Sequence, residues 1–137
     1  MEINLKRKNN KFNFEAINEG GQVVDIDANP AIGGEGKGFR PMEMMLVGLG
    51  GCSGIDMVNI LTKQKEELTD IQIKIQATRR DEEPAIFEEI NINFDLFGPL
   101  NDQKVKRAID LTFDKYCSVA NILGRSAKIN FSYNIKS

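Results

Sequence analysis

The sequence contains no histidine, and it has only two cysteines among its 137 residues. Without an imidazole the chain cannot build a Ser-His-Asp or Cys-His catalytic group, and a histidine-ligated metal site is excluded as well. Two cysteines alone cannot close a usual structural zinc site. They are also too few for the disulfide framework of a small secreted protein. We therefore expect neither a metal nor any other cofactor.

The chain also has neither a large net charge nor a long apolar run. A net charge of -2 and an isoelectric point near 5.3 argue against binding to nucleic acid or to an anionic membrane surface. The longest strongly apolar run, Met44 to Leu49, is too short to span a bilayer, and residues 1–8 contain no apolar signal core. We therefore expect a cytoplasmic protein that forms one domain over residues 1–137.

The chain is organised around a long apolar segment that leads away from a proline. Pro41 suits the first turn of a helix, because its missing N–H costs nothing there. Glu43 follows in the same turn, where its carboxylate can meet the positive helix end and reach back to the N–H of Arg40 in a capping box. These features predict one helix from Pro41 to Lys63.

This helix is apolar on nearly every side and is rich in glycine. An interior glycine costs about 1 kcal/mol relative to alanine, which a chain tolerates where another backbone must approach closely. The alternative is a flexible or broken helix at Gly50-Gly51. A helix that is apolar all round is buried on most sides, and one chain of this length would struggle to cover it. We therefore expect an intertwined homodimer with this helix at its centre.

Alternation of apolar and polar residues predicts strands on both sides of the helix. Strands are expected at 2–8, 11–17 and 22–27 before it, and at 68–79, 86–97 and 126–136 after it. Between the last two strands we expect a helix capped by Asn101 or Asp102 and a short helix capped by Ser118. The glycine-rich segment 28–39 is either a plain linker or a lid over the helix start. This order predicts an α+β fold with antiparallel sheets around a long central helix.

Polar residues on the long helix form a single stripe. Cys52, Asp56, Asn59 and Lys63 recur at i, i+4, i+7 and i+11, so they share one face. Asp56 works against a thiolate at Cys52 unless a cation from Arg40, or from Lys63 of a partner helix, offsets its charge. The stripe would equally serve to bond the two central helices of a dimer to each other.

The second cysteine, Cys117, comes much later, just before a predicted helix N-terminus. A thiol in such a position can have a lowered pKa, and the thiolate is the nucleophilic form. The sequence alone cannot show that Cys117 and Cys52 meet. Two unrelated cysteines that act as small buried hydrophobes remain the alternative.

Two segments of the sequence resemble the OsmC/Ohr family. They are the run from Arg40 to Val58, which contains Gly50-Gly51-Cys52-Ser53-Gly54, and the later run Tyr116-Cys117-Ser118-Val119. The resemblance covers essentially the whole chain in element order and implies an α+β homodimer with swapped elements. It also implies reduction of an organic hydroperoxide, in which one cysteine attacks the peroxide, the other resolves it as a disulfide, and a dithiol restores both. By this resemblance Cys52 is the peroxidatic residue and Cys117 the resolving one.

The sequence departs from the peroxidase pattern of that family in three places. Segment 18–22 lacks the arginine of the family's first hairpins, the helix glutamate Glu43 stands one residue late, and Asp56 follows the first cysteine by one turn. The helix resembles the OsmC-like branch, with Glu43, Arg40 and Asp56 as supporting candidates. The alternative function is a non-enzymatic dimeric module that binds small apolar ligands or partners in the cleft between subunits.

Overall fold

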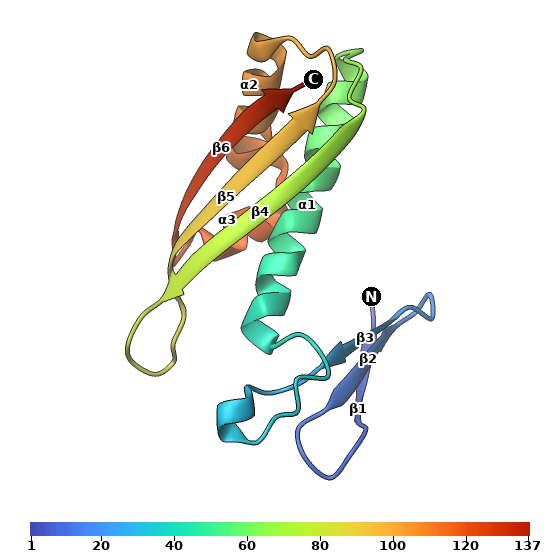
Figure 1. The fold of residues 1–137 in the computed structure, drawn as a ribbon, viewed down its shortest axis with the longest axis vertical. Coiled ribbons are helices and arrows are strands. Elements are labelled where there is room, and N and C mark those ends of the chain that lie inside the picture. The colour runs from blue at the N-terminus through green and yellow to red at the C-terminus, as the bar shows by residue number, and fades with distance from the viewer. The chain divides into compact units, whose positions relative to one another are not determined.

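The computed structural model describes residues 1–137 and divides into two compact units, residues 1–47 and 48–137. The boundary falls inside helix α1 (Pro41–Lys63), which runs through both units without a break (Figure 1). The prediction of one domain stays a prediction. The two units are therefore described separately.

Alternating residues build an antiparallel meander in the first unit. Strands β1 (Ile3–Arg7), β2 (Phe14–Asn18) and β3 (Val23–Ile26) pair in that order, which confirms the three strands predicted before the helix. The sheet carries a pocket of about 410 Å³ with apolar walls, to which Ile3, Leu5, Val23, Val24, Ile26 and Met44 contribute. The first unit by itself thus leaves an apolar surface open.

One buried carboxylate organises the segment between β3 and α1. Asp27 is 2% exposed and accepts backbone N–H bonds from Ala28, Glu35 and Lys37 at 2.8, 3.2 and 3.1 Å. Burial works against its charge, yet these bonds and the nearby Lys37 ammonium hold the pKa of Asp27 below its ordinary value. The segment, which contains the 3-10 turn η1 (Pro30–Ile32), is an ordered loop rather than a plain linker. Its role as a lid stays a prediction.

Helix α1 starts in the way that the sequence predicts. The Oε1 atom of Glu43 accepts the N–H of Arg40 at 2.8 Å, which completes one half of the capping box. The helix continues through Gly50-Gly51, so the alternative of a broken helix is wrong.

Only one face of α1 is buried within the second unit. Its buried residues are Leu49, Ser53, Gly54, Met57 and Leu61. Elsewhere on the helix Ile55 is 71% exposed and Val58 40% exposed, and a Cβ atom added to Gly51 would meet nothing within 4 Å. The second unit by itself does not achieve the predicted burial of α1 on most sides. We call Gly51, Ile55 and Val58 the open face of α1.

By length and composition alone, α1 would also suit a membrane. An 18-residue window within it has a mean hydropathy of 1.5. The core helix of a soluble protein passes the same test. Of that window, 28% is buried in the structure.

The sheet of the second unit consists of β4 (Asp70–Arg79), β5 (Phe87–Phe97) and β6 (Lys128–Lys136), in this order. Strands β4 and β5 are antiparallel, but β5 and β6 are parallel. The prediction of wholly antiparallel sheets is therefore wrong for this pair. The helices between β5 and β6 carry the chain back to the end of the sheet where β5 begins, and parallel neighbours need such a crossover. The α+β class itself is confirmed.

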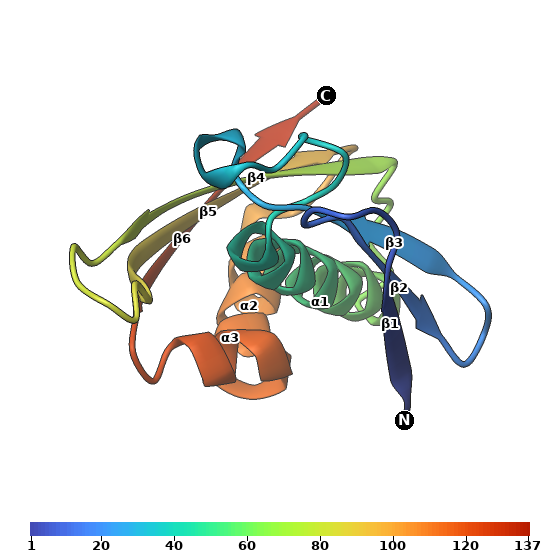
Figure 2. The same cartoon turned by 90° about the horizontal axis from the view of Figure 1, so that it is seen from below.

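Glycines let α1 lie close to β4. A Cβ atom added to Gly54 would come within 2.8 Å of the Cδ1 atom of Ile73, and one added to Gly50 within 3.1 Å of the Cδ1 atom of Ile75. The glycines thus serve close packing against isoleucine side chains of the same chain. Helices α1 and α2 (Asp102–Leu111) lie on the same face of this sheet (Figure 2).

The crossover from β5 to β6 holds three helical segments. Helix α2 is capped by Asn101, which accepts the N–H of Lys104 at 3.1 Å and confirms one of the two predicted caps. A π-helical turn, η2 (Thr112–Tyr116), follows, and the short helix α3 (Ser118–Leu123) completes the connection.

Candidate functional site

Cys117 is held in place by the wide turn that precedes it. The N–H of Cys117 donates to the carbonyl oxygen of Thr112 at 2.8 Å, which closes the π-turn. Within that turn the ring of Phe113 stacks on Phe131 of β6, with ring centroids 4.6 Å apart. The aromatic contact fixes the turn to the sheet, and the turn fixes the start of α3.

The N-cap of α3 is Cys117 itself. Its Sγ atom accepts the N–H of Ala120 at 3.4 Å. The prediction of Ser118 as the cap is therefore one residue late. A thiol that accepts this bond lies over the first turn of the helix. Cys117 is accordingly only 3% exposed.

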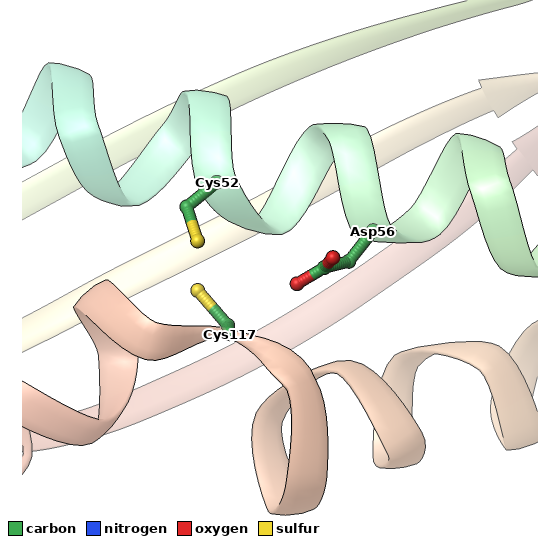
Figure 3. Close-up of side chains that lie close together, drawn as sticks. All are labelled: Cys52, Asp56 and Cys117. Atoms are coloured by element: carbon green, nitrogen blue, oxygen red, sulfur yellow. The ribbon is translucent and has the colours of Figure 1, made fainter.

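Three side chains converge where α3 approaches α1 (Figure 3). Cys52 and Asp56 come from adjacent turns of α1, and Cys117 comes from the start of α3. The two sulfur atoms and a carboxylate oxygen of Asp56 all lie within 4.8 Å of one another. Both thiols are free, and Cys52 is half-buried. The structure thus brings together two cysteines that the sequence could not connect.

The environment of Cys117 disfavours its thiolate. Burial raises the pKa of Cys117 well above its ordinary value, and the neighbouring Cys52 and Asp56 raise it further. The N–H of Ala120 acts in the opposite direction. The expectation of a lowered pKa at this helix N-terminus is therefore wrong, because loss of solvation outweighs the hydrogen bond from the helix end.

Asp56 is an unpaired carboxyl group. Burial raises the pKa of Asp56 above its ordinary value, and its Oδ2 atom is enclosed with no hydrogen-bond partner. None of the ion pairs in the structure includes Asp56. No cation is therefore paired with Asp56 to offset its negative charge, although the sequence predicts that a thiolate at Cys52 needs one.

The other predicted supporting residues lie outside this cluster. Arg40 and Glu43 belong to the first unit, where both are exposed and the capping bond joins them. Their part in chemistry stays a prediction. Asn59 and Lys63 continue the polar stripe of α1 away from the thiols.

A groove of about 280 Å³ adjoins the cluster through Asp56. Its walls come from α1, α2 and η2, namely Asp56, Asn59, Ile60, Lys63, Gln64, Arg107, Leu111 and Tyr116. Sequence reasoning missed Arg107 and Leu111. Their i, i+4 spacing on one helix face, shortly before Cys117, is the signal that would have indicated them. The groove offers mixed apolar and cationic walls beside the thiols.

Asp56→Asn is expected to stabilise the reduced protein at neutral pH in metal-free buffer. Because the folded-state pKa of Asp56 is raised, the folded chain binds this proton more tightly than the unfolded chain does. Below the unfolded pKa of about 3.9 the carboxyl group is protonated in both states, and its stabilising contribution is lost as the pH rises through the folded pKa. The variant, which cannot ionise, should therefore unfold at a higher temperature than the parent at neutral pH but not below about pH 4. The measurement is thermal unfolding across this range.

The exposed Asp114, changed to Asn, is the matched control and should show no comparable pH-dependent gap. An Asp56→Asn effect of the same size at every pH would contradict the assignment of the effect to a buried ionisation.

Comparison with known proteins places this site in a family. Residues 34–132 match the OsmC-like protein family. Protein YhfA of Escherichia coli (strain K12) is 45% identical over 100 residues, which are 72% of this chain and 75% of that protein. A hypothetical protein from Aquifex aeolicus VF5 has 32% sequence identity to this chain. Its crystal structure matches with a TM-score of 0.86 over 98% of this chain and 95% of that one. An organic hydroperoxide resistance protein OsmC from Legionella pneumophila shares the fold at 16% identity, with a TM-score of 0.73 over 98% of this chain and 97% of that one. The family match covers most of the chain and confirms the resemblance seen in the sequence, so the chain belongs to the OsmC-like protein family.

Proposed function

We propose that this protein is a thiol peroxidase that reduces organic hydroperoxides and is itself reduced by a dithiol. The observation that carries the proposal is the pair of free thiols, Cys52 and Cys117, with their sulfur atoms within 4.8 Å of each other. A modest closing motion would bring them to bonding distance. The Legionella protein that shares the fold is named an organic hydroperoxide resistance protein, and we take the substrate class of the proposal from that name.

The difference in burial supports different roles for the two cysteines. Cys52 is half-buried, whereas Cys117 is 3% exposed and has a raised pKa. A hydroperoxide therefore reaches Cys52 more easily. Cys117 stays protonated until a nearby electrophile appears, as suits a resolving thiol.

The reaction needs three steps. The Cys52 thiolate attacks one oxygen of the hydroperoxide, the O–O bond breaks, and the alkoxide leaves as an alcohol after it takes a proton. Solvent that reaches the half-buried Cys52 can supply this proton. Cys117 then loses its proton and attacks the sulfenic sulfur of Cys52, which expels water and forms a disulfide. A dithiol reduces that disulfide by exchange and regenerates both thiols.

The proposal is tested by turnover of the full chain. Reduced protein is mixed with an alkyl hydroperoxide and dihydrolipoamide, and hydroperoxide consumption is followed. We expect slow but measurable reduction, because no cation is paired with Asp56 to favour a nearby thiolate. Alkyl hydroperoxides should react severalfold faster than hydrogen peroxide, because Ile60, Leu111 and Tyr116 give the adjoining groove apolar walls. Absence of turnover with every dithiol tried would contradict the proposal.

A second candidate function is a non-enzymatic dimeric module that binds small apolar ligands or partners between its subunits. The unpaired carboxyl group of Asp56 and the raised pKa of Cys117 favour it, since both oppose a thiolate. Under this alternative the cysteine pair no longer has a catalytic role. The same turnover assay separates the two functions.

Both proposed functions, the peroxidase and the binding module, include a homodimer that is located in the cytoplasm. The open face of α1 and the open apolar sheet of the first unit each need a cover, and a second copy of the chain would supply it. A reducing compartment would keep both thiols free between turnovers.

A further inference from the structure

Cys52, Asp56 and Cys117 form a set of donors suited to a metal ion. We propose that the reduced protein binds a thiophilic divalent cation of the zinc class through the two sulfur atoms and one carboxylate oxygen of these residues. Zinc in proteins is bound by thiolate sulfur, imidazole nitrogen and carboxylate oxygen, usually in a tetrahedron. The inference does not rest on peroxidase activity, because it needs only the reduced thiols and the carboxylate.

The geometry lies close to that of a tetrahedral site. With Zn–S distances of about 2.3 Å and Zn–O distances of about 2.0–2.2 Å, donor atoms lie roughly 3.5–3.8 Å apart. The present separations of up to 4.8 Å must therefore shorten by about 1 Å. Side-chain rotation of Cys52 and Asp56, which share one face of a regular helix, can supply this without moving the backbone.

Asp56 supplies the ligand that two cysteines lack. The sequence alone excluded a structural zinc site because two thiols are too few, and it could not show that Cys117 meets Cys52 and Asp56. With Asp56 as third ligand, water would complete the tetrahedron, which is the arrangement of open zinc sites. The groove beside Asp56 offers a route for the ion and room for that water.

The charges of the cluster support a cation at its centre. Asp56 Oδ2 is enclosed, has no hydrogen-bond partner, and takes part in no ion pair. Burying an unpaired carboxylate is costly, and a bound divalent cation would remove this cost. The N–H of Ala120 on the Cys117 sulfur is the kind of outer hydrogen bond that orients a metal ligand.

Neither cationic side chain of the groove forms an ion pair with Asp56. Lys63 follows Asp56 by seven residues, which is about 10 Å along the helix axis. Arg107 belongs to α2 and is exposed. Both side chains can extend into solvent while the cluster holds its ion.

Metal binding and disulfide formation exclude each other. When the ion binds, both thiols become thiolates bonded to it and two protons are released. When the thiols are oxidised, their electrons form the S–S bond and the ion loses two ligands. A bound cation would therefore protect Cys52 and Cys117 from oxidation and slow their reaction with hydroperoxides.

Cobalt(II) titration of the reduced full chain, in anaerobic metal-free buffer, tests the proposal. We expect one ion per chain, a thiolate-to-cobalt charge-transfer band, and the visible bands of a tetrahedral site, all abolished by an excess of zinc. Cys52→Ser and Cys117→Ser should each lose at least half of the charge-transfer intensity. Asp56→Asn should bind at least about tenfold more weakly.

Two controls make the result decisive. Asp114→Asn, an exposed carboxylate close in sequence to Cys117, should bind cobalt like the parent, and the disulfide form of the parent should not bind it. A parent without a charge-transfer band at tenfold excess cobalt would overturn the proposal. Equal affinity of the parent and Asp56→Asn would overturn it as well. Peroxidase turnover without cobalt binding would refute only the metal site, and cobalt binding without turnover would refute only the proposed peroxidase.

Discussion

Cys52→Ser is expected to abolish hydroperoxide reduction, with a fall in kcat/KM on the order of a thousandfold or more, the scale seen when a catalytic nucleophile is removed. A serine hydroxyl is not ionised at neutral pH and cannot take an oxygen atom from a peroxide to form a sulfenic acid. The substitution replaces one half-buried side chain of α1 by another of similar size, so the fold should persist. The measurement is dithiol-dependent consumption of an alkyl hydroperoxide, with circular dichroism to confirm folding.

Cys117→Ser is the matched control for this loss. A serine hydroxyl is a good N-cap, so it can replace the Cys117 sulfur as acceptor for the N–H of Ala120 and keep α3 intact. This variant should still consume one equivalent of hydroperoxide, but it should then stop and accumulate Cys52 as sulfenic and sulfinic acid. The parent should instead form one disulfide that links Cys52 and Cys117, seen by peptide mapping.

Two results would contradict the proposed roles. Turnover by Cys52→Ser equal to that of the parent would show that Cys52 is not the attacking thiol. Recovery of parent Cys52 only as sulfinic acid, with Cys117 unmodified, would show that Cys117 does not resolve it.

The elements that the sequence predicted well are those set by local rules. The capping contact between Arg40 and Glu43 depends on neighbours within one helical turn, so Pro41 and Glu43 were enough to locate the start of α1. The alternation of Ile71, Ile73 and Ile75 depends only on the two-residue period of a strand, and in the structure all three side chains are half-buried on one face of the sheet. Candidate site residues Cys52 and Asp56 also followed from helical spacing alone.

The features that the sequence did not predict depend on contacts between distant residues. The parallel pairing of β5 and β6 is decided by where the crossover of α2, η2 and α3 ends, which no local pattern records. The cap of α3 is Cys117 and not the predicted Ser118. The π-turn before it, which the stacking of Phe113 on Phe131 of β6 holds against the sheet, sets where α3 starts. The raised pKa of Cys117 follows from packing that buries its sulfur, against the local effect of a helix N-terminus.

The open face of α1 gives the second large expected effect: Ile55→Glu should convert a dimer into a monomer. In one chain Ile55 is 71% exposed, so a glutamate there costs the folded chain little. In a dimer that buries this face, two carboxylates would lose solvation without a partner. We expect the dissociation constant to rise at least about a hundredfold, which corresponds to about 2.7 kcal/mol. Light scattering at micromolar concentration measures the mass, and circular dichroism shows whether the helices persist.

Gly51→Leu tests the same face by shape instead of charge. A Cβ atom at Gly51 meets nothing within 4 Å, and leucine in a helix interior is favoured over glycine by roughly 0.8 kcal/mol, so the single chain should not suffer. A second copy that approaches closely at Gly51 would be pushed away. Gly54→Leu is the contrast, because its Cβ would come within 2.8 Å of Ile73 and should destabilise the chain itself.

These three variants separate assembly from folding. If a second copy covers the open face, Ile55→Glu and Gly51→Leu should lower the mass and keep the helical signal, whereas Gly54→Leu should lower the melting temperature. Gln103→Glu, an exposed change on α2, should leave both the mass and the melting temperature unchanged. A parent that is a stable folded monomer at micromolar concentration would refute the dimer, and so would an Ile55→Glu variant that remains one.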